Sequence, residues 1–214
     1  MSELTNVQCV YYNGLLYLAC GTYVTETENL GELSDQFSSI DLRTGELTPL
    51  KPLMQSRENF ALLVTEDGYI YAIGGRNQET VSSLVERYNI SEKNWEVMDS
   101  LQFAKGNCAG FVTKSNIYVY DFENRKSCVE RYDLLKNAWE AESDMVMRGD
   151  FYGRVCGESC GIEKILAFEL EGIDNNDDQV GFQYFEFVES GNEWIKRESV
   201  FEYGKEAIVF YNSC

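Results

Sequence analysis

The chain of 214 residues contains no histidine and only two prolines. Without histidine it lacks the imidazole ligands of most zinc and copper sites and the commonest general base, which excludes chemistry that depends on them. No run near 18 consecutive apolar residues occurs, and no charged-then-apolar leader follows Met1. Neither membrane spanning nor secretion is therefore indicated, and we expect a cytoplasmic protein.

Positive charge is also scarce, with 18 Lys and Arg against 36 Asp and Glu and a net charge of −18. The acidic residues are spread along the whole chain, and no basic stripe interrupts them. Such a surface repels phosphate backbones, so we expect no nucleic-acid binding. Solubility is the simplest account of this charge, and steering of a basic partner is the alternative.

Two features of the sequence could suggest a metal site, the seven cysteines and one acidic run. Cys156 and Cys160 lie four residues apart, but no second pair stands at ligand spacing, and cysteines in a reducing compartment are usually small buried hydrophobes. The acidic run 171–178 could offer oxygen ligands to calcium, but Gln179 stands where the binding loop needs glycine and Phe185 where it needs a bidentate acid. We therefore predict no metal and no cofactor.

One phrase occurs twice in the chain. Val85-Glu-Arg-Tyr, with Trp95-Glu seven residues beyond its tyrosine, returns 44 residues later as Val129-Glu-Arg-Tyr with Trp139-Glu. A period in the forties is typical of a propeller blade of four strands. Weaker copies flank these two, at 13–21, 39–47, 164–169 and 187–194.

Each repeat divides into four predicted strands, which are short runs of aromatic and branched residues between turn residues. In the second repeat they lie at 59–64, 69–74, 83–89 and around Trp95, with a tight turn at Glu66-Asp-Gly68. Four antiparallel strands per unit, repeated side by side, form the blades of a β-propeller.

These features resemble the kelch-repeat family over essentially the whole chain, strongly over 54–145. The matching features are the pair Gly74-Gly75, the strand Ser83-x-Val-Glu-Arg-Tyr, the tryptophan seven residues after the tyrosine, and Arg57 before Phe60. The third repeat has Tyr120-Asp121 in place of the glycines, which predicts a reshaped strand end. WD-type propellers are disfavoured because their Gly-His element needs histidine.

The resemblance implies an all-β fold, a kelch-type β-propeller of about four four-stranded blades plus one extra C-terminal strand. One propeller region then spans 1–214, with blades at about 7–53, 54–101, 102–147 and 148–199 and the terminal strand at about 207–211. Kelch propellers usually have six blades, so we expect an incomplete or open propeller, similar to the C-terminal blades of a BTB-kelch protein. Its open edges and apolar faces would need cover from a partner or from self-association.

Recurrence assigns several candidate residues to the scaffold. Glu86 and Arg87 repeat identically, whereas catalytic groups are normally unique, so we interpret them as paired structural charges at blade contacts. No helix follows Gly74-Gly75, which favours close packing over a phosphate cradle. The fixed position of the tryptophans Trp95, Trp139 and Trp194 predicts packing between blades rather than a ligand platform.

Function is therefore expected in loops, where the repeats differ. In the kelch family, loops between strands two and three share a rim with the connections between blades and take a partner's peptide. Those loops are 23–34, 76–82, 123–127 and 172–180, and the connections lie near 55–57, 104–105 and 147–150. The predicted partner-binding residues are Arg76, Asn77, Arg125, Lys126 and Asp150, with Arg57 ambiguous because its family position is partly structural.

The resemblance implies a protein-interaction module rather than an enzyme, of the kind that recognises substrates for cullin-type ubiquitin ligases. No BTB segment is recognised here, so we expect this chain alone not to bind a cullin. Actin binding is the alternative within the family, although an acidic chain suits acidic actin poorly. A propeller enzyme using carboxylates or tyrosines stays open, but no motif supports one.

Overall fold

A computed structural model describes residues 3–25, 28–78, 80–121, 129–142, 165–170, 182–191 and 193–197. Its described elements are β-strands in antiparallel sheets, with one short 3-10 turn at Glu189–Gly191. No described helix is long and apolar enough to cross a membrane. The chain divides into two compact units, residues 1–142 and 143–213, and each is described by itself.

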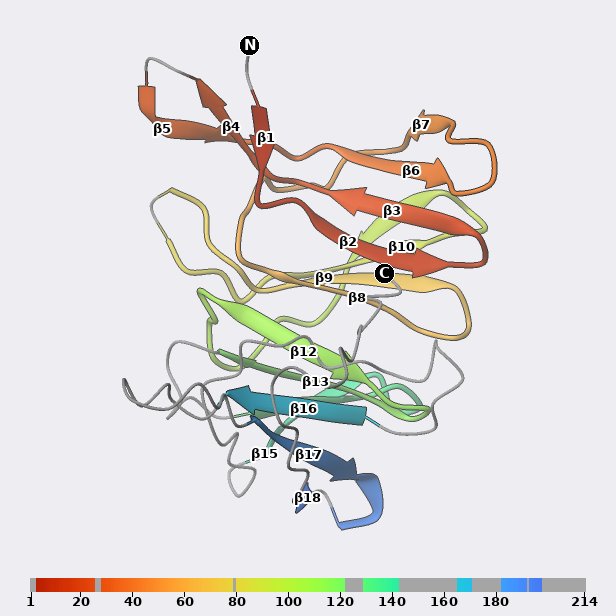
Figure 1. Ribbon diagram of the computed structural model, residues 1–214, viewed down its shortest axis with the longest axis vertical. Coiled ribbons are helices and arrows are strands. Elements are labelled where there is room, and N and C mark those ends of the chain that lie inside the picture. The colour runs from red at the N-terminus through yellow and green to blue at the C-terminus, as the bar shows by residue number, and fades with distance from the viewer. Residues whose placement is uncertain are drawn as a thin grey trace, which may run out of the picture. The chain divides into compact units, whose positions relative to one another are not determined.

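The N-terminal unit contains three four-stranded sheets, here called blades 1 to 3 (Figure 1). Within each blade the strands lie side by side in chain order, as in a meander. The predicted all-β fold of four-stranded blades is thereby confirmed. Blade 1 contains β2 (Gln8–Tyr12), β3 (Leu15–Ala19), β6 (Phe37–Asp41) and β7 (Leu47–Pro49); blade 2 contains β8 (Ala61–Val64), β9 (Tyr69–Ile73), β10 (Val85–Asn89) and β11 (Asn94–Val97); blade 3 contains β12 (Cys108–Val112), β13 (Asn116–Asp121), β14 (Val129–Asp133) and β15 (Ala138–Glu142).

A further sheet was not predicted. Most of the expected loop 23–34 of blade 1 folds as a hairpin of β4 (Thr22–Thr25) and β5 (Glu28–Leu33). The outer side of β4 pairs with β1 (Glu3–Thr5), which precedes blade 1. Pairing with a distant strand supplies partners for backbone groups that a loop would leave to water.

The C-terminal unit contains a three-stranded antiparallel sheet of β16 (Ile165–Leu170), β17 (Phe182–Val188) and β18 (Glu193–Arg197). Phe187 pairs with Trp194 in register, as Tyr88 pairs with Trp95 in blade 2. The predicted terminal strand 207–211 and the acidic run 171–178 lie outside the described residues.

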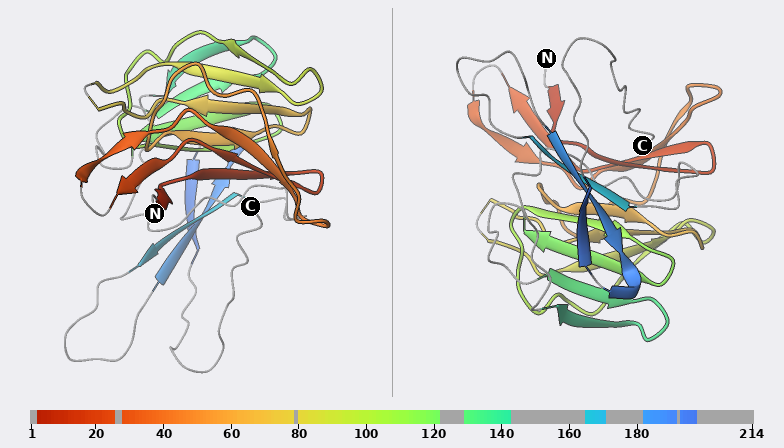
Figure 2. Two further views of the ribbon diagram at one scale, coloured as in Figure 1. Left: turned by 90° about the horizontal axis from the view of Figure 1, so that it is seen from above. Right: turned by 60° about the horizontal axis from the view of Figure 1, so that its bottom comes forward.

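Alternation along each strand builds the core between blades. On β9, Ile70 and Ala72 pack into the apolar cluster shared with blade 1, whereas Tyr71 and Ile73 pack into the cluster shared with blade 3. The first strands of the blades are neighbours, with β8 contacting both β2 and β12 (Figure 2). Blade 2 is therefore buried on both faces.

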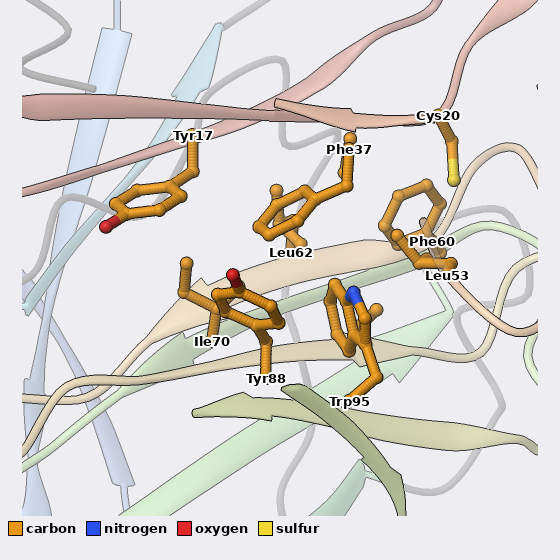
Figure 3. Packing of buried hydrophobic residues seen from close by; sticks show 11 residues of the cluster. Tyr17, Cys20, Phe37, Leu53, Phe60, Leu62, Ile70, Tyr88 and Trp95 are labelled. Carbon is orange, nitrogen blue, oxygen red and sulfur yellow. The ribbon is translucent and has the colours of Figure 1, made fainter. Parts of the chain in front are cut away.

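The repeated tryptophan lies at this interface. Figure 3 shows Trp95 and Tyr88 pointing toward Phe37 of blade 1, with ring centroids 5.0 and 4.8 Å from that of Phe37. Trp95 Nε1 also donates to the Lys51 carbonyl oxygen at 2.8 Å, and Trp139 Nε1 donates to that of Asp99 at 2.9 Å. Packing between blades is thus confirmed for both; the Trp194 side chain lies outside the description.

The turn between strands three and four is the same in all three blades. Asp41, Asn89 and Asp133 each accept hydrogen bonds at Oδ1 from the backbone amides two and three residues ahead. Four residues beyond each of them the backbone is left-handed, with φ values of 75°, 55° and 52° at Gly45, Lys93 and Asn137. This turn aligns the blades residue by residue.

The paired glycines serve packing, as predicted. Gly74 and Gly75 have φ values of 65° and 88°, and a Cβ on Gly75 would lie 2.6 Å from the Glu58 carbonyl oxygen. In blade 3 the strand register makes Asp121 the equivalent of Gly74, one residue later than the expected Tyr120. There β13 continues through Asp121 as a strand, and its carboxylate accepts a hydrogen bond from the Gly106 amide at 3.0 Å.

Candidate partner-binding rim

Two buried carboxylates hold the connections between blades. Glu86 on β10 is fully buried and accepts a hydrogen bond from the Met54 amide at 2.6 Å. Its other oxygen pairs with the guanidinium of Arg57, which also donates to the carbonyl oxygens of Gly74 and Leu84, both at 3.1 Å. A charge taken out of water needs such partners. The repeated glutamate therefore belongs to the scaffold, as predicted.

Blade 3 repeats this arrangement with a different cation. Glu130 accepts from the amides of Gln102 and Phe103 at 2.6 and 3.1 Å, and Lys105 Nζ lies 3.0 Å from Glu130 Oε1. Lys105 is fully buried, like Glu130. Lys105 lies in a connection that is expected to face a partner, but burial assigns its side chain to the interior.

The side chain of Arg57, like that of Lys105, is buried. Its side chain is 1% exposed and is bound by Glu86 and two carbonyl oxygens, so a partner at the surface would not reach it. Of its two predicted roles, the structural one fits this geometry.

Arg76 lies where a loop meets two connections. It forms backbone bridges with Glu58 on one side and Val81 on the other, and its Nε donates to the Gly106 carbonyl oxygen at 3.4 Å. Lys105 N also donates to the Ser82 carbonyl oxygen at 3.2 Å. The loop between strands two and three of blade 2 thus lies against the connections on both sides of that blade, as the family's rim predicts.

Asn77 shapes this loop from within. Its Oδ1 accepts from the amide of Thr80 at 2.8 Å and from the Thr80 hydroxyl at 3.1 Å, and its own amide donates to the Thr80 carbonyl oxygen at 3.1 Å. Gln78 Nε2 then reaches the Gly31 carbonyl oxygen on β5 at 3.4 Å. The unpredicted hairpin of blade 1 therefore adjoins the same loop.

Three exposed apolar side chains were not predicted, because they carry no charge or amide group that would mark them in the sequence. Met54, Val81 and Phe103 are 53%, 52% and 52% exposed, and all three lie in the loop 76–82 or in the connections beside it. We call these segments, residues 54–58, 76–82 and 102–106, the rim. Arg125, Lys126 and Asp150 lie outside the described residues.

The chemistry of the described residues does not suggest catalysis. Burial raises the pKa of the Cys20 thiol to about 11 and that of Cys108 to about 12, so both stay protonated and unreactive near neutral pH. No group of three or more Asp, Glu or Cys that could hold a metal occurs within the described part of the chain. The rim offers a surface of loops rather than a reactive centre.

Comparison with known proteins agrees with this arrangement. The model of the Kelch motif matches residues 61–102, which span blade 2 and the start of the next connection. A RING finger domain and kelch repeat-containing protein of Dictyostelium discoideum is 40% identical over 76 residues, covering 33% of this chain and 8% of that protein.

Two further relatives are longer matches at lower identity. Kelch-like protein 36 of Bos taurus is 25% identical over 178 residues, covering 75% of this chain and 28% of that protein. Kelch repeat and BTB domain-containing protein 2 of horsepox virus is 29% identical over 112 residues, covering 42% of this chain and 20% of that protein. The matched stretches therefore span between 8% and 28% of these relatives.

Proposed function

Because this chain contains kelch repeats, which form protein-interaction modules, we propose that its rim binds a protein partner. One observation carries the proposal: the buried pairs, tryptophans and turns repeat from blade to blade, whereas residues 76–82 do not. The loop is held on a rigid scaffold by Arg76 and Asn77. Loops that differ on a fixed scaffold are where recognition usually lies.

The rim favours a partner segment with an apolar anchor. Val81 and Phe103 are each about half exposed, and exposed apolar groups among polar neighbours are typical of interaction surfaces. Val81 lies over Gly106, where a Cβ would be 3.3 Å from the valine side chain. Arg76 adds a cation beside this apolar surface, on a chain that is otherwise acidic.

We further propose that the bound protein is a substrate of a ubiquitin ligase. Relatives of this chain carry a RING finger or BTB domain by name, and the BTB domains of kelch-like proteins contact cullins. The blades would then recognise the substrate and a separate domain would contact the ligase. The thiols of Cys20 and Cys108, which form no disulfide, suit the reducing cytoplasm, where such assemblies act.

The test is partner capture by matched variants under photo-crosslinking. Val81→Glu places a charge on the rim, and Leu135→Glu places one on the turn of blade 3, where Leu135 is 87% exposed. We expect a partner cross-linked from residue 78 of the parent chain to be lost with Val81→Glu and kept with Leu135→Glu. Equal loss or equal retention in both variants would reject the rim, and direct binding of a cullin to the isolated chain would reject the division of roles.

A further inference from the structure

The outer edge of the third strand of blade 2 is paired over most of its length. β11 pairs with β10 along this edge. Beyond the end of β11, the Met98 amide donates to the Val85 carbonyl oxygen at 2.9 Å, and the Leu101 amide donates to that of Ser83 at 2.9 Å. The fourth strand and the connection after it therefore cover this edge as far as Ser83.

The connection then leaves the edge. The amides of Gln102 and Phe103 donate to Glu130 of blade 3, so these two residues no longer pair with blade 2. The connection returns at Lys105, whose amide donates to the Ser82 carbonyl oxygen at 3.2 Å. Val81, the next residue along the edge, is bound by neither contact.

The backbone groups of Val81 point outward along this edge. Val81 forms an antiparallel bridge with Arg76. The hydrogen bonds of this bridge are made by the neighbouring residues, from the Ser82 amide to the Gly75 carbonyl oxygen at 2.8 Å and from the Asn77 amide to the Thr80 carbonyl oxygen at 3.1 Å. In a pair of this kind, the amide and carbonyl groups of the two central residues point away from each other.

The outward groups of these two residues meet different surroundings. Arg76 exchanges two backbone hydrogen bonds with Glu58, both of 2.9 Å. The amide and carbonyl oxygen of Val81 have no hydrogen-bond partner within the described part of the chain. One donor and one acceptor, spaced as in a β-ladder, are therefore available at this position.

Blade 1 shows that an outward carbonyl on the equivalent edge accepts a hydrogen bond. Strand pairing places Leu33 of β5 at the position of Val81. Gly31 lies two residues before Leu33 and therefore on the same edge. Its carbonyl oxygen accepts a hydrogen bond from the side chain of Gln78, in the loop of blade 2, at 3.4 Å.

Apolar side chains lie beside the open backbone groups. Val81 and Phe103 are both 52% exposed. A peptide that adds a strand to a sheet is held by main-chain hydrogen bonds and selected by its side chains. The surroundings of Val81 offer both kinds of contact.

We propose that a partner segment in extended conformation adds to blade 2 at Val81 as a further strand. The segment donates a backbone amide to the Val81 carbonyl oxygen and accepts the Val81 amide at a carbonyl oxygen of its own. An apolar side chain of the segment contacts Phe103. This inference rests on the proposed role of the rim in binding a protein, and it adds that the partner is held through its main chain.

The experiment uses a synthetic peptide as the probe. Short peptides displayed on phage are selected on the whole chain, and a peptide is kept if Val81→Glu abolishes its binding. An ester in place of the Val81 amide then removes only the hydrogen-bond donor. We expect the dissociation constant of the peptide to rise about tenfold with this ester, and at least as much with Val81→Pro, because a main-chain hydrogen bond is lost.

The matched control is an ester at Asp67, on the turn between β8 and β9. Its amide also has no hydrogen-bond partner among the described residues, so the chemical change is the same at a site far along the strand from the rim. We expect the control to bind like the parent and all three proteins to unfold at similar urea concentrations. In hydrogen exchange followed by NMR, the Val81 amide should exchange rapidly in the parent alone and slowly in the complex.

The two proposals about the rim can fail separately. Unchanged affinity of the Val81 ester, or unchanged exchange of the Val81 amide, would overturn strand addition but leave the rim as a binding surface. Selection of no such peptide, while a folded partner still cross-links from residue 78, would do the same. Self-association of the parent that the Val81 ester abolishes would make a second copy the occupant, and would overturn the assignment to a different protein.

Discussion

Blades 2 and 3 have the same strand order and turn geometry but fill several equivalent positions with different residues. The buried glutamate pairs with Arg57 in blade 2 and with Lys105 in blade 3. Both cations are buried beside a carboxylate that also accepts hydrogen bonds from backbone amides. The position therefore requires a buried cation, and either Arg or Lys can supply it.

The blades also differ in whether the hydroxyl of the repeated tyrosine has a hydrogen-bond partner. In blade 3, the Tyr132 hydroxyl donates to Asn137 Oδ1 at 3.3 Å, and Asn137 occupies the left-handed turn position. In blade 2, Lys93 occupies that position, and the buried Tyr88 hydroxyl has no hydrogen-bond partner. At this position the tyrosine hydroxyl is therefore hydrogen-bonded in blade 3 but not in blade 2, although blade 2 matches the family pattern best.

The largest expected effect is loss of the buried carboxylate charge. Glu86→Gln and Glu130→Gln should each lower the free energy of unfolding by about 3–5 kcal/mol, because each leaves a buried cation without its counter-charge. Urea denaturation of both variants measures this. If only one variant is strongly destabilised, the two anchors are not equivalent and the comparison between the blades fails.

The next effect concerns the strand end that differs between the blades. Gly75→Ala should cost about 2–4 kcal/mol, because a Cβ meets the Glu58 carbonyl oxygen and the backbone is left-handed. Gly45→Ala is the control, since Gly45 also has positive φ but has no atom within 4 Å of the added Cβ. Equal losses of stability in denaturant would show that backbone conformation alone, without the close contact, sets the requirement.

Placing the asparagine of the blade 3 turn at the equivalent position of blade 2 should stabilise the protein. Lys93→Asn should add about 1–2 kcal/mol, because asparagine tolerates the left-handed conformation and can accept the Tyr88 hydroxyl hydrogen bond. Tyr88→Phe should be nearly neutral in the parent but cost about 1 kcal/mol in the Lys93→Asn background. Thermal denaturation of the four proteins completes the cycle; additive effects would mean that no new hydrogen bond forms.

The smallest effect lies on the surface, where the blades agree. Arg87 pairs with Glu96 at 2.6 Å and Arg131 pairs with Glu140 at 2.5 Å, and both carboxylates are more than 40% exposed. Glu96→Gln and Glu140→Gln should each cost about 0.2–1 kcal/mol, less still in high salt. A loss approaching that of Glu86→Gln in the same urea titration would contradict the distinction between buried and surface pairs.

Much of the fold could be predicted because the repeated phrase fixes local spacing. From Val85 to Trp95 the chain is a strand, a tight turn and a strand, and the hydrogen bonds that form the turn are short-range. The turn residue Asn89 and the paired glycines have backbone requirements that the sequence shows directly. These features needed no knowledge of distant partners.

The features that were missed depend on distant partners. Arg57 and Lys105 lie 48 residues apart, whereas the glutamates they meet lie 44 apart, so the repeat did not reveal the pairing. Pairing of β1 with the hairpin of β4 and β5 is likewise non-local. On the rim, Val81 and Phe103 carried no charge or motif to mark them, and only their exposure does.

The anchoring of each connection by the next blade also has a consequence for synthesis at the ribosome. Residues 54–57 are made well before Glu86, which is their partner, and residues 102–105 well before Glu130. Until the later glutamate emerges, Arg57 and then Lys105 must stay in water. The connection that follows a blade is therefore not yet bound when that blade's last strand is made. It becomes bound only after most of the next blade has been synthesised. Limited proteolysis of stalled chains should cleave within 54–57 when the chain stops before Glu86 and spare that segment once β10 has emerged.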